Sequence, residues 1–271
     1  MSERRACRVV EQHRSTQRYE LQATDQTRLL VKRMHELSDA HPRYGYRRIW
    51  ALLRAEGWRV NRKRVERLWR KEGLRVPAPV KRGQRAIGDA DQAVWKLKAE
   101  HENHIWAYDF VSEKTRRGTT IKILNVVDEF TRQVVACHVD RSIGANRIVE
   151  VLVEAFRVHG VPGMIRSDNG REFIAQTVLE FLEGRGVTPA FIEKGRPQQN
   201  GFVERFNGVM RDELLNREVF HTLLEARVIT REWVEAYNTR RPHSALGYQT
   251  PTQYAKELRY QNRKQHIGRN T

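Results

Sequence analysis

The sequence of 271 residues predicts an α/β protein in which a mixed five-stranded sheet with flanking helices follows a small all-α domain. Three observations predict this fold class. Apolar residues recur at helical spacing between residues 25 and 76. From about residue 104, three β-branched or aromatic runs follow one another, and helical and strand-like segments then alternate. The length also suits two domains, at roughly 100 to 200 residues per domain.

Basic residues dominate the composition and favour a polyanionic partner such as nucleic acid. Lys and Arg number 50 against 33 Asp and Glu, which gives a formal charge of +17. An acidic membrane surface is the alternative partner. No apolar run approaches the roughly 18 residues of a spanning helix, and the N-terminus lacks the apolar core of a signal peptide. We therefore expect a cytoplasmic protein, and we expect Cys7 and Cys137 to be reduced thiols because their spacing does not fit a zinc site.

Residues 1–24 are predicted to form a basic arm and residues 25–76 a helix-turn-helix domain. Its first helix is predicted over residues 25–41, ends before Pro42, and has an apolar face of Leu29, Leu30, Met34 and Leu37. The segments "YGYRRIWALLRAEG" and "RKRVERLWRKEG" give two shorter amphipathic helices. Asn61 is the expected N-cap of the last helix, and Gly57 and Gly73 are the expected ends of the two.

The last of these helices is strongly basic, as expected of a helix that enters a DNA major groove. Between residues 41 and 85, fifteen Lys or Arg face three acids, so intrahelical ion pairs cannot account for the charge. A solvated charged face is the alternative interpretation. The cations predicted to contact DNA are Arg47, Arg48, Arg62, Lys63, Arg64, Arg67, Arg70 and Lys71.

Residues 77–100 are predicted to be a linker, residues 101–216 the α/β domain and residues 217–271 a helical extension and tail. The runs "HIWAYDFVSEK", "TTIKILNVVDEF" and "RQVVACHVD" predict an antiparallel meander. The remaining elements alternate as helix, strand, helix, strand, helix, and the strand-helix-strand connections require parallel neighbours. In the extension, Thr222 and Glu225 predict a capping box, and "RRPHSALG" predicts a loop that either anchors the core or contacts DNA.

Three carboxylates occupy informative places in this α/β order. Asp109 falls inside the first, apolar strand, where burial of an unpaired carboxylate is costly, although a solvated face is the alternative. Asp168 ends the fourth strand, where ligands bind in open sheets. Glu204 lies near the start of the last helix. Their spacing is weak evidence in a chain with 33 acids, so the prediction depends on these positions.

The helix of Glu204 has a predicted apolar stripe of Val203, Phe206, Met210 and Leu214. Glu204 borders this stripe, in line with Gly208 and Arg211, and the mid-helix glycine indicates a close approach of substrate backbone. Three converging carboxylates suit Mg²⁺ or Mn²⁺, and two such ions can promote attack on a phosphodiester. Other acids have simpler interpretations: Asp128 and Glu129 as turn residues, and Glu172 in the first turn of a helix.

Several motifs together resemble one family. They are "HPRYGYRRIWALLRAEGWRVNRKRVERLWRKEGL", "WAYDF", "LNVVDEFTR", "IRSDNGREF", "GRPQQNGFVERFNG" and "YNTRRPHSALGYQTP". The chain resembles the second-frame (OrfB) transposase of bacterial insertion sequences, in the family typified by insertion sequence three, within the DDE transposase and retroviral integrase superfamily. The resemblance implies an RNase H-like catalytic core with Asp109, Asp168 and Glu204 as catalytic and metal-binding residues. Within the glutamate motif, Asn200, Asn207 and Arg211 are predicted DNA contacts, and the loop "GRPQQNG" is a predicted active-site loop.

The resemblance also implies the chemistry and the partners. With Mg²⁺ or Mn²⁺, water would cleave at the end of the element, and the freed 3′-hydroxyl would attack a second phosphodiester without a covalent protein intermediate. The expected partners are terminal inverted repeats, target DNA, further copies of the chain on DNA, and the upstream-frame (OrfA) protein, alone or as a frameshift fusion. A bacterial, nucleoid-associated location is expected. The alternatives are a metal-dependent nuclease on the same fold and a non-catalytic DNA-binding regulator.

Overall fold

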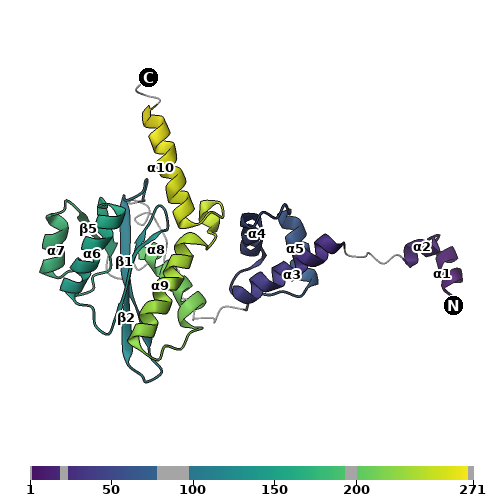
Figure 1. Cartoon of the computed structure of the whole chain (residues 1–271), viewed down its shortest axis with the longest axis horizontal. Helices are drawn as coiled ribbons and strands as arrows, with labels where there is room; N and C mark the ends of the chain where they lie inside the picture. The colour runs from purple at the N-terminus through teal and green to yellow at the C-terminus, as the bar shows by residue number, and fades with distance from the viewer. Residues whose placement is uncertain (1, 19–23, 78–97, 193–199, 268–271) are drawn as a thin grey trace. The chain divides into compact units, whose positions relative to one another are not determined.

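The computed structural model describes residues 2–18, 24–77, 98–192 and 200–267, and divides into two compact units, Met1–Pro77 and Ala78–Thr271 (Figure 1). Most of the predicted linker and residues 195–199 of the predicted active-site loop lie outside the described residues. The predicted basic arm contains two short helices, α1 (Glu3–Val9) and α2 (Arg14–Gln17), joined by a bidentate bond from Arg18 to Glu3.

The first unit contains the three predicted helices, α3 (Asp25–Ala40), α4 (Tyr46–Ala55) and α5 (Arg62–Lys71). Asn61 caps α5, because its side chain accepts a hydrogen bond from the Lys63 amide at 2.8 Å, as predicted. Gly57 and Gly73 follow α4 and α5 with φ of 91° and 68°, in the left-handed region that lets the chain turn out of a helix. The helix-turn-helix prediction is thereby confirmed.

One apolar cluster joins the three helices of the first unit and includes Met34, Ile49, Leu53 and Val65, all fully buried. Leu29 was wrongly placed on the buried face of α3, since it is 60% exposed while its neighbour Leu30 is buried. The two residues are 100° apart on a helix, so only one of them can face a packed neighbour here.

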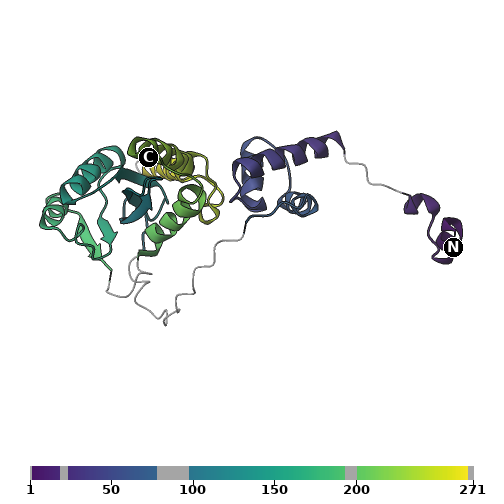
Figure 2. The same cartoon turned by 90° about the horizontal axis from the view of Figure 1, so that it is seen from below.

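The second unit is built on a sheet of five strands, β1 (Ile105–Lys114), β2 (Thr120–Asp128), β3 (Val134–Asp140), β4 (Met164–Ser167) and β5 (Thr188–Phe191). The strand order is β3-β2-β1-β4-β5. Figure 2 shows this sheet from below, between helices on either side. β1, β2 and β3 pair antiparallel, whereas β4 pairs parallel to both β1 and β5. The mixed sheet predicted from the order of elements is therefore confirmed.

Helices cover both faces of this sheet (Figure 1). On one face, α6 (Ala145–His159) and α7 (Gln176–Glu183) pack on a cluster that includes Trp106, Tyr108 and Leu124. On the other, α8 (Gly201–Met210), the π-helical turn η3 (Arg211–Leu215) and α9 (Leu223–Thr239) pack on residues that include Ala107 and Val111. Because side chains alternate along a strand, Asp109 shares the face of Ala107 and Val111 and lies on the α8 side.

The structure corrects the prediction for Glu172, confirms that for Asp128, and adds a contact of Glu129. Glu172 is not in a helix, because α7 begins only at Gln176; it forms an ion pair with Lys122 instead. The Asp128 carboxylate accepts the amides of Phe130 and Thr131, which confirms its turn role. Glu129 also lies in that turn, but it is 1% exposed and pairs with Arg166, a contact that the turn interpretation missed.

The edge strand β3 is bonded at both ends by side chains of α9. Asn238 accepts the Val134 amide at 2.9 Å and donates to the Val134 carbonyl at 2.8 Å, in the manner of a neighbouring strand. Arg227 donates to the Val139 carbonyl at 2.9 Å. Side chains of α9 thus occupy backbone groups at both ends of this edge strand.

The chain ends in the short turn η4 (Ser244–Leu246) and the helix α10 (Pro251–Ile267). The predicted capping box of α9 is present, with Thr222 and Glu225 bonded reciprocally to backbone amides. The "RRPHSALG" loop packs on the core, since Arg241 and His243 are buried. Among the described residues, no helix is both long enough and apolar enough to cross a membrane.

Candidate active site

Asp109 and Asp168 lie at equivalent positions of two neighbouring parallel strands. β1 pairs with β4 from Ile105 and Met164 to Ala107 and Arg166. Each aspartate is two residues beyond the last pair, and adjacent strands lie about 4.8 Å apart. The sequence predicted convergence on the condition that these strands were neighbours, and the sheet meets that condition.

The Asp109 carboxylate is held by hydrogen bonds to both oxygens. The Phe110 amide donates to Oδ1 at 2.7 Å, and the Asn207 side chain donates to Oδ2 at 2.9 Å. Burial, opposed in part by these bonds and reinforced by the charges of Asp168 and Glu204, raises the pKa of Asp109 to about 6. The three carboxylates therefore share one electrostatic environment.

The "SDNG" turn after β4 fixes the Asp168 side chain. Its Oδ1 accepts the Gly170 amide at 2.9 Å. A Cβ atom at position 170 would lie 2.9 Å from the same oxygen and 3.3 Å from the Phe173 ring, so a side chain there would displace the Asp168 carboxylate. Phe173 in turn packs on Tyr108 and Phe110, the two neighbours of Asp109 in β1.

Glu204 lies in the first turn of α8, where the positive end of the helix dipole favours a carboxylate. Val203, Phe206, Met210 and Leu214 are buried as predicted, so the apolar stripe is confirmed and Glu204 stays exposed beside it. A Cβ atom at Gly208 would meet nothing within 4 Å. Packing within the protein therefore does not require this glycine, and a close approach of substrate there stays a prediction.

A chain of amides links the sheet to Asp109. The Asn125 side chain, in β2 directly opposite Asp109, donates to the Asn207 side chain at 2.8 Å, and Asn207 donates to Asp109. Since Asn125 is fully buried and donates, the Asn207 oxygen faces Asn125 and its NH₂ group faces the carboxylate. Sequence reasoning missed Asn125, although an Asn inside the apolar run "IKILNVVD" is the same kind of signal as Asp109 in β1.

Comparison with known proteins gives the same two units. The family described as "HTH-like domain" matches residues 24–82, and two descriptions of "Integrase core domain" match residues 99–197 and 185–251. The chain is 38% identical to the 31.7-kDa protein of insertion element IS407 of Burkholderia multivorans, over 96% of this chain and 92% of that protein. It is 29% identical to a putative transposase for insertion sequence element IS150 of Escherichia coli, over 91% of each chain.

The chain belongs to the insertion-sequence transposase family. It is a DDE-type transposase with an RNase H-like integrase core and a helix-turn-helix DNA-binding domain, as the resemblance implied. Among solved structures, the catalytic core domain of HTLV-2 integrase in complex with magnesium is similar, with a TM-score of 0.46 and 23% identity over 56% of this chain and 96% of that one.

The three carboxylates of the transposase, those of Asp109, Asp168 and Glu204, are of the chemical kind that binds a hard divalent cation. Within the described ranges, no three His, Cys, Asp or Glu side chains lie close enough to hold a metal ion. Carboxylate oxygens are the ligands that Mg²⁺ and Mn²⁺ prefer. Burial and the neighbouring carboxylates raise the pKa of Asp109, and a cation beside it would oppose both effects by stabilising its ionised form.

The predicted DNA contacts of the transposase core are engaged within the protein. Asn200 is 2% exposed at the start of α8, and its amide points to the Tyr108 carbonyl at 3.5 Å. Arg211 pairs with Glu113 at 3.0 Å and donates to the Ser112 carbonyl. With Asn207 bonded to Asp109, all three side chains hold α8 against β1, and their contacts with DNA stay predictions.

Several cations of the helix-turn-helix unit contact other side chains of that unit, and some of these, such as Arg70, are exposed as well. Arg64 donates to Thr27 at 2.8 Å, Arg70 pairs with Glu66 at 2.7 Å, and Arg48 lies 5.1 Å from the Tyr44 ring. The exposed members of the predicted set are Arg47, Arg62, Lys63, Arg67, Arg70 and Lys71. The acids Glu56 and Glu72 face Arg33 and His35 of α3, so they do not neutralise the exposed side of α5.

A buried ionic group beside α8 was not found from the sequence. Glu129 pairs with Arg166 at 3.0 Å, and burial raises the pKa of Glu129 to about 7 despite that cation. Arg132 lies 4.0 Å from the ring of Phe202, two residues before Glu204. Burial lowers the pKa of Arg132, which adopts a φ of 64°. The contact between Arg132, in the turn that joins β2 and β3, and Phe202 holds the first turn of α8 in place.

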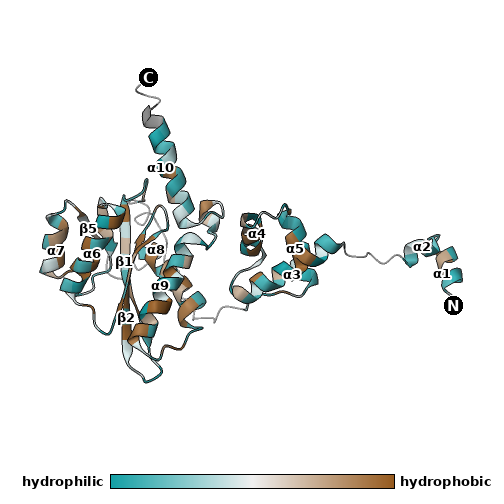
Figure 3. Ribbon diagram, in the orientation of Figure 1, coloured by the Kyte–Doolittle hydropathy of each residue, from teal (hydrophilic) through white to brown (hydrophobic). Residues whose placement is uncertain are grey.

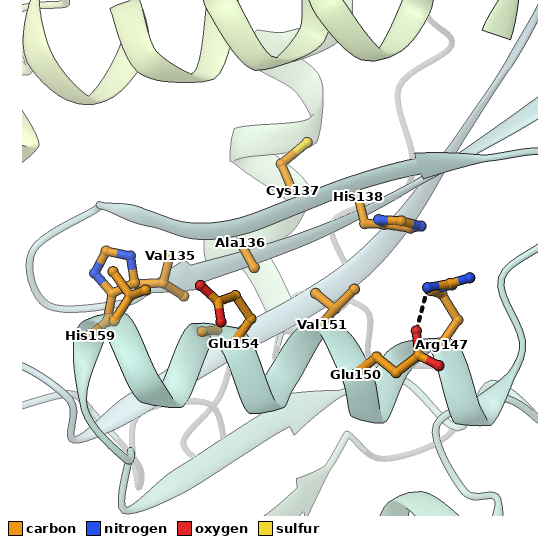
Figure 4. A pocket seen from close by; sticks show the side chains of 11 residues that line it. Val135, Ala136, Cys137, His138, Arg147, Glu150, Val151, Glu154 and His159 are labelled. Atoms are coloured by element: carbon orange, nitrogen blue, oxygen red, sulfur yellow. Dashed lines mark hydrogen bonds and ion pairs between the residues drawn. The ribbon is translucent and has the colours of Figure 1, made fainter. Parts of the chain in front are cut away.

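The hollow between β3 and α6 contains none of the three carboxylates (Figure 4). It has a volume of about 380 Å³, and its polar rim consists of Arg147, Glu150, Glu154 and His159. Cys137 points to the opposite face of the sheet, and burial raises the pKa of its thiol to about 12. The thiol is therefore protonated and unreactive near neutral pH, and both cysteines are free as predicted.

The metal-free transposase is expected to gain stability when Asp109 is replaced by Asn. The raised pKa of Asp109 means that the folded state retains a proton which the unfolded state has lost, so stability falls as pH rises from about 4 to about 7. Asp109→Asn removes this charge, and we expect it to raise the free energy of unfolding at pH 7.5 by about 1 to 3 kcal/mol. At pH 4 the difference should be small. Denaturant titrations at both pH values check this, and a variant that is less stable than the wild type at pH 7.5 would contradict the electrostatic explanation.

Proposed function

We propose that the chain cleaves at the ends of an insertion element and transfers the freed 3′-hydroxyl strand to a second DNA site, with Asp109, Asp168 and Glu204 as the catalytic residues. The observation that supports this most strongly is the parallel register of β1 and β4, in which Asp109 and Asp168 each follow the last backbone pair by two residues. The raised pKa of Asp109 gives independent support, because its causes include both other carboxylates.

The three carboxylates would hold Mg²⁺ or Mn²⁺, and two such ions would activate the attacking oxygen and stabilise the leaving oxygen at the phosphodiester. The protein's own residues orient these ligands. The Phe110 amide and Asn207 fix Asp109, and the Gly170 amide fixes Asp168. Arg132 and Arg211 brace the two ends of α8, through Phe202 and Glu113, and so set the place of Glu204.

DNA binding would involve both units. The exposed cations of α5 fit the phosphate backbone around a major groove, and the terminal inverted repeats are the proposed specific sequence. The proposed assembly is an oligomer of this chain on DNA, with the upstream-frame protein as a further partner, in the bacterial nucleoid. A chain with a formal charge of +17 suits such a location.

Joining of pre-cut DNA tests the proposal and separates a transposase from a plain nuclease. A duplex with the element's terminal sequence and a recessed 3′-hydroxyl should be joined to a supercoiled plasmid when Mg²⁺ is present. The same duplex with a 3′-dideoxy end should not be joined, because the attacking oxygen is absent. Cleavage of both substrates without joining would identify a nuclease, and binding without either reaction would identify a regulator.

A further inference from the structure

The helix α10 has two faces of different chemistry. Residues at positions 251, 254, 255, 258 and 259 form the face that packs on the second unit, with Ala255 2% exposed, the Tyr254 ring 6.1 Å from that of Phe130, and Arg259 bonded to Glu102 through two nitrogens. These positions follow the i, i+3, i+4, i+7 pattern of one helix side. Packing on the second unit therefore explains the residues on one side of α10 and not those on the opposite side.

The opposite side consists of three cations and an aromatic ring. Lys256, Tyr260, Arg263 and Lys264 have the spacing i, i+4, i+7, i+8 and are all exposed. We call these four residues the α10 stripe. The Lys264 ammonium lies 4.8 Å from the centre of the Tyr260 ring, which keeps both side chains on this side of the helix. The stripe thus presents a continuous positive surface.

Acids within the described part of the chain do not neutralise the α10 stripe. None of its three cations forms an ion pair there, and Glu257, the acid of α10, is bonded to Gln249 and Gln261 instead. Figure 3 shows α10 hydrophilic along most of its length, running away from the sheet of its own unit. A polar helix without many i,i+4 ion pairs gains little stability from its own side chains.

We infer that the α10 stripe binds the phosphate backbone of duplex DNA. From Lys256 to Lys264 the helix rises about 12 Å, a length over which one strand of B-DNA presents about three or four phosphate charges. Three cations on that length match a run of phosphates on one side of a groove, and the Lys264 ammonium lies over the Tyr260 ring between them. The inference rests on the proposed function, because it gives the catalytic unit its own contact with the DNA that it processes.

The test compares the salt dependence of DNA binding by the full chain and its variants. Lys256→Gln/Arg263→Gln/Lys264→Gln should reduce the slope of log K against log salt by about 2.7, at about 0.9 per lost phosphate contact, and weaken binding at 0.1 M salt roughly tenfold or more. The charge-preserving variant Lys256→Arg/Arg263→Lys/Lys264→Arg should keep the wild-type slope. The charge-matched control is Arg147→Gln/Arg157→Gln/Arg185→Gln, which removes exposed cations around α6 and α7 and should also keep the slope.

Several outcomes would overturn the inference. The first is an unchanged salt slope in the triple Gln variant of the α10 stripe. The second is an equal loss of salt slope in the charge-matched control. The third is a triple Gln variant that loses self-association and keeps its DNA binding. All substituted positions are exposed, and unchanged melting temperatures would show that the variants fold. Because the readout is binding, it is separate from the proposed function. If the wild type joins DNA but the triple Gln variant keeps the wild-type salt slope, only the role of α10 is contradicted. If the wild type binds DNA but does not join it, only the strand-transfer assignment is contradicted.

Discussion

Asp109→Asn, Asp168→Asn and Glu204→Gln are each expected to abolish Mg²⁺-dependent cleavage and joining, with a loss of roughly 10³-fold or more in rate. Each substitution replaces a charged oxygen ligand by an amide at a position where three carboxylates share one electrostatic environment. Because the residues act as a unit, double variants should be little worse than single ones. Rates on a labelled terminal duplex, measured with and without Mg²⁺, check the expectation.

The matched control is Glu183→Gln, which removes an exposed carboxylate of α7 and should leave both reactions unchanged. DNA binding should also survive in all three active-site variants, because the exposed cations of α5 and α10 remain. Activity near the wild-type level in any one of the three would remove that residue from the site. Loss of binding together with activity would show instead that the variant had not folded.

Arg241→Ala is expected to destabilise the protein by about 3 to 5 kcal/mol, because it breaks a buried bidentate ion pair by removing the cation. Arg241 donates to both oxygens of Glu213, at 2.8 and 2.6 Å, and the two side chains are 5% and 9% exposed. Glu213 lies in the π-helical turn that follows α8, so the pair ties the "RRPHSALG" loop to the end of the helix that bears Glu204. Denaturant unfolding of the variant measures the loss.

An exposed pair of the same chemistry provides the control for Arg241. Arg157 and Glu154 also form a bidentate pair, but their side chains are 70% and 62% exposed, so Arg157→Ala should cost less than about 1 kcal/mol. Replacing both buried partners, as in Arg241→Met/Glu213→Met, should cost much less than Arg241→Ala, since no charge is then buried alone. Equal losses in Arg241→Ala and Arg157→Ala would show that burial does not set the strength of the pair.

The sequence was sufficient for the elements whose signals are local. The helical stripes of α3, α4, α5 and α8 and the β-branched runs of the meander predicted their own structure, and Asp109 was informative because a carboxylate interrupts an apolar strand. The "SDNG" turn was likewise readable, since an aspartate before an Asn-Gly pair commonly bonds the backbone two residues on, as Asp168 bonds the Gly170 amide.

Contacts between distant segments could not be read in the same way. The pairing of β1 with β4, the amide chain from Asn125 to Asp109 and the pair of Arg241 with Glu213 join residues that are 28 to 98 positions apart. Nothing in the composition of either segment specifies its partner. Leu29 and Glu172 were predicted wrongly for a different reason. Periodicity shows which side of a helix is apolar, but it does not show how wide the buried side is, as at Leu29, or where the helix begins, as at Glu172.

The bonds of Asn238 and Arg227 to strand β3 also bear on contacts between copies of the protein. An open strand edge is a template for sheet extension from chain to chain, and a crowded array of basic proteins on a polyanion raises the local concentration that drives such growth. The bonds from Asn238 and Arg227 occupy backbone groups at both ends of β3, so a strand from a second copy would find Val134 and the Val139 carbonyl already bonded. At this edge of the sheet, the side chains of α9 therefore oppose sheet extension between copies.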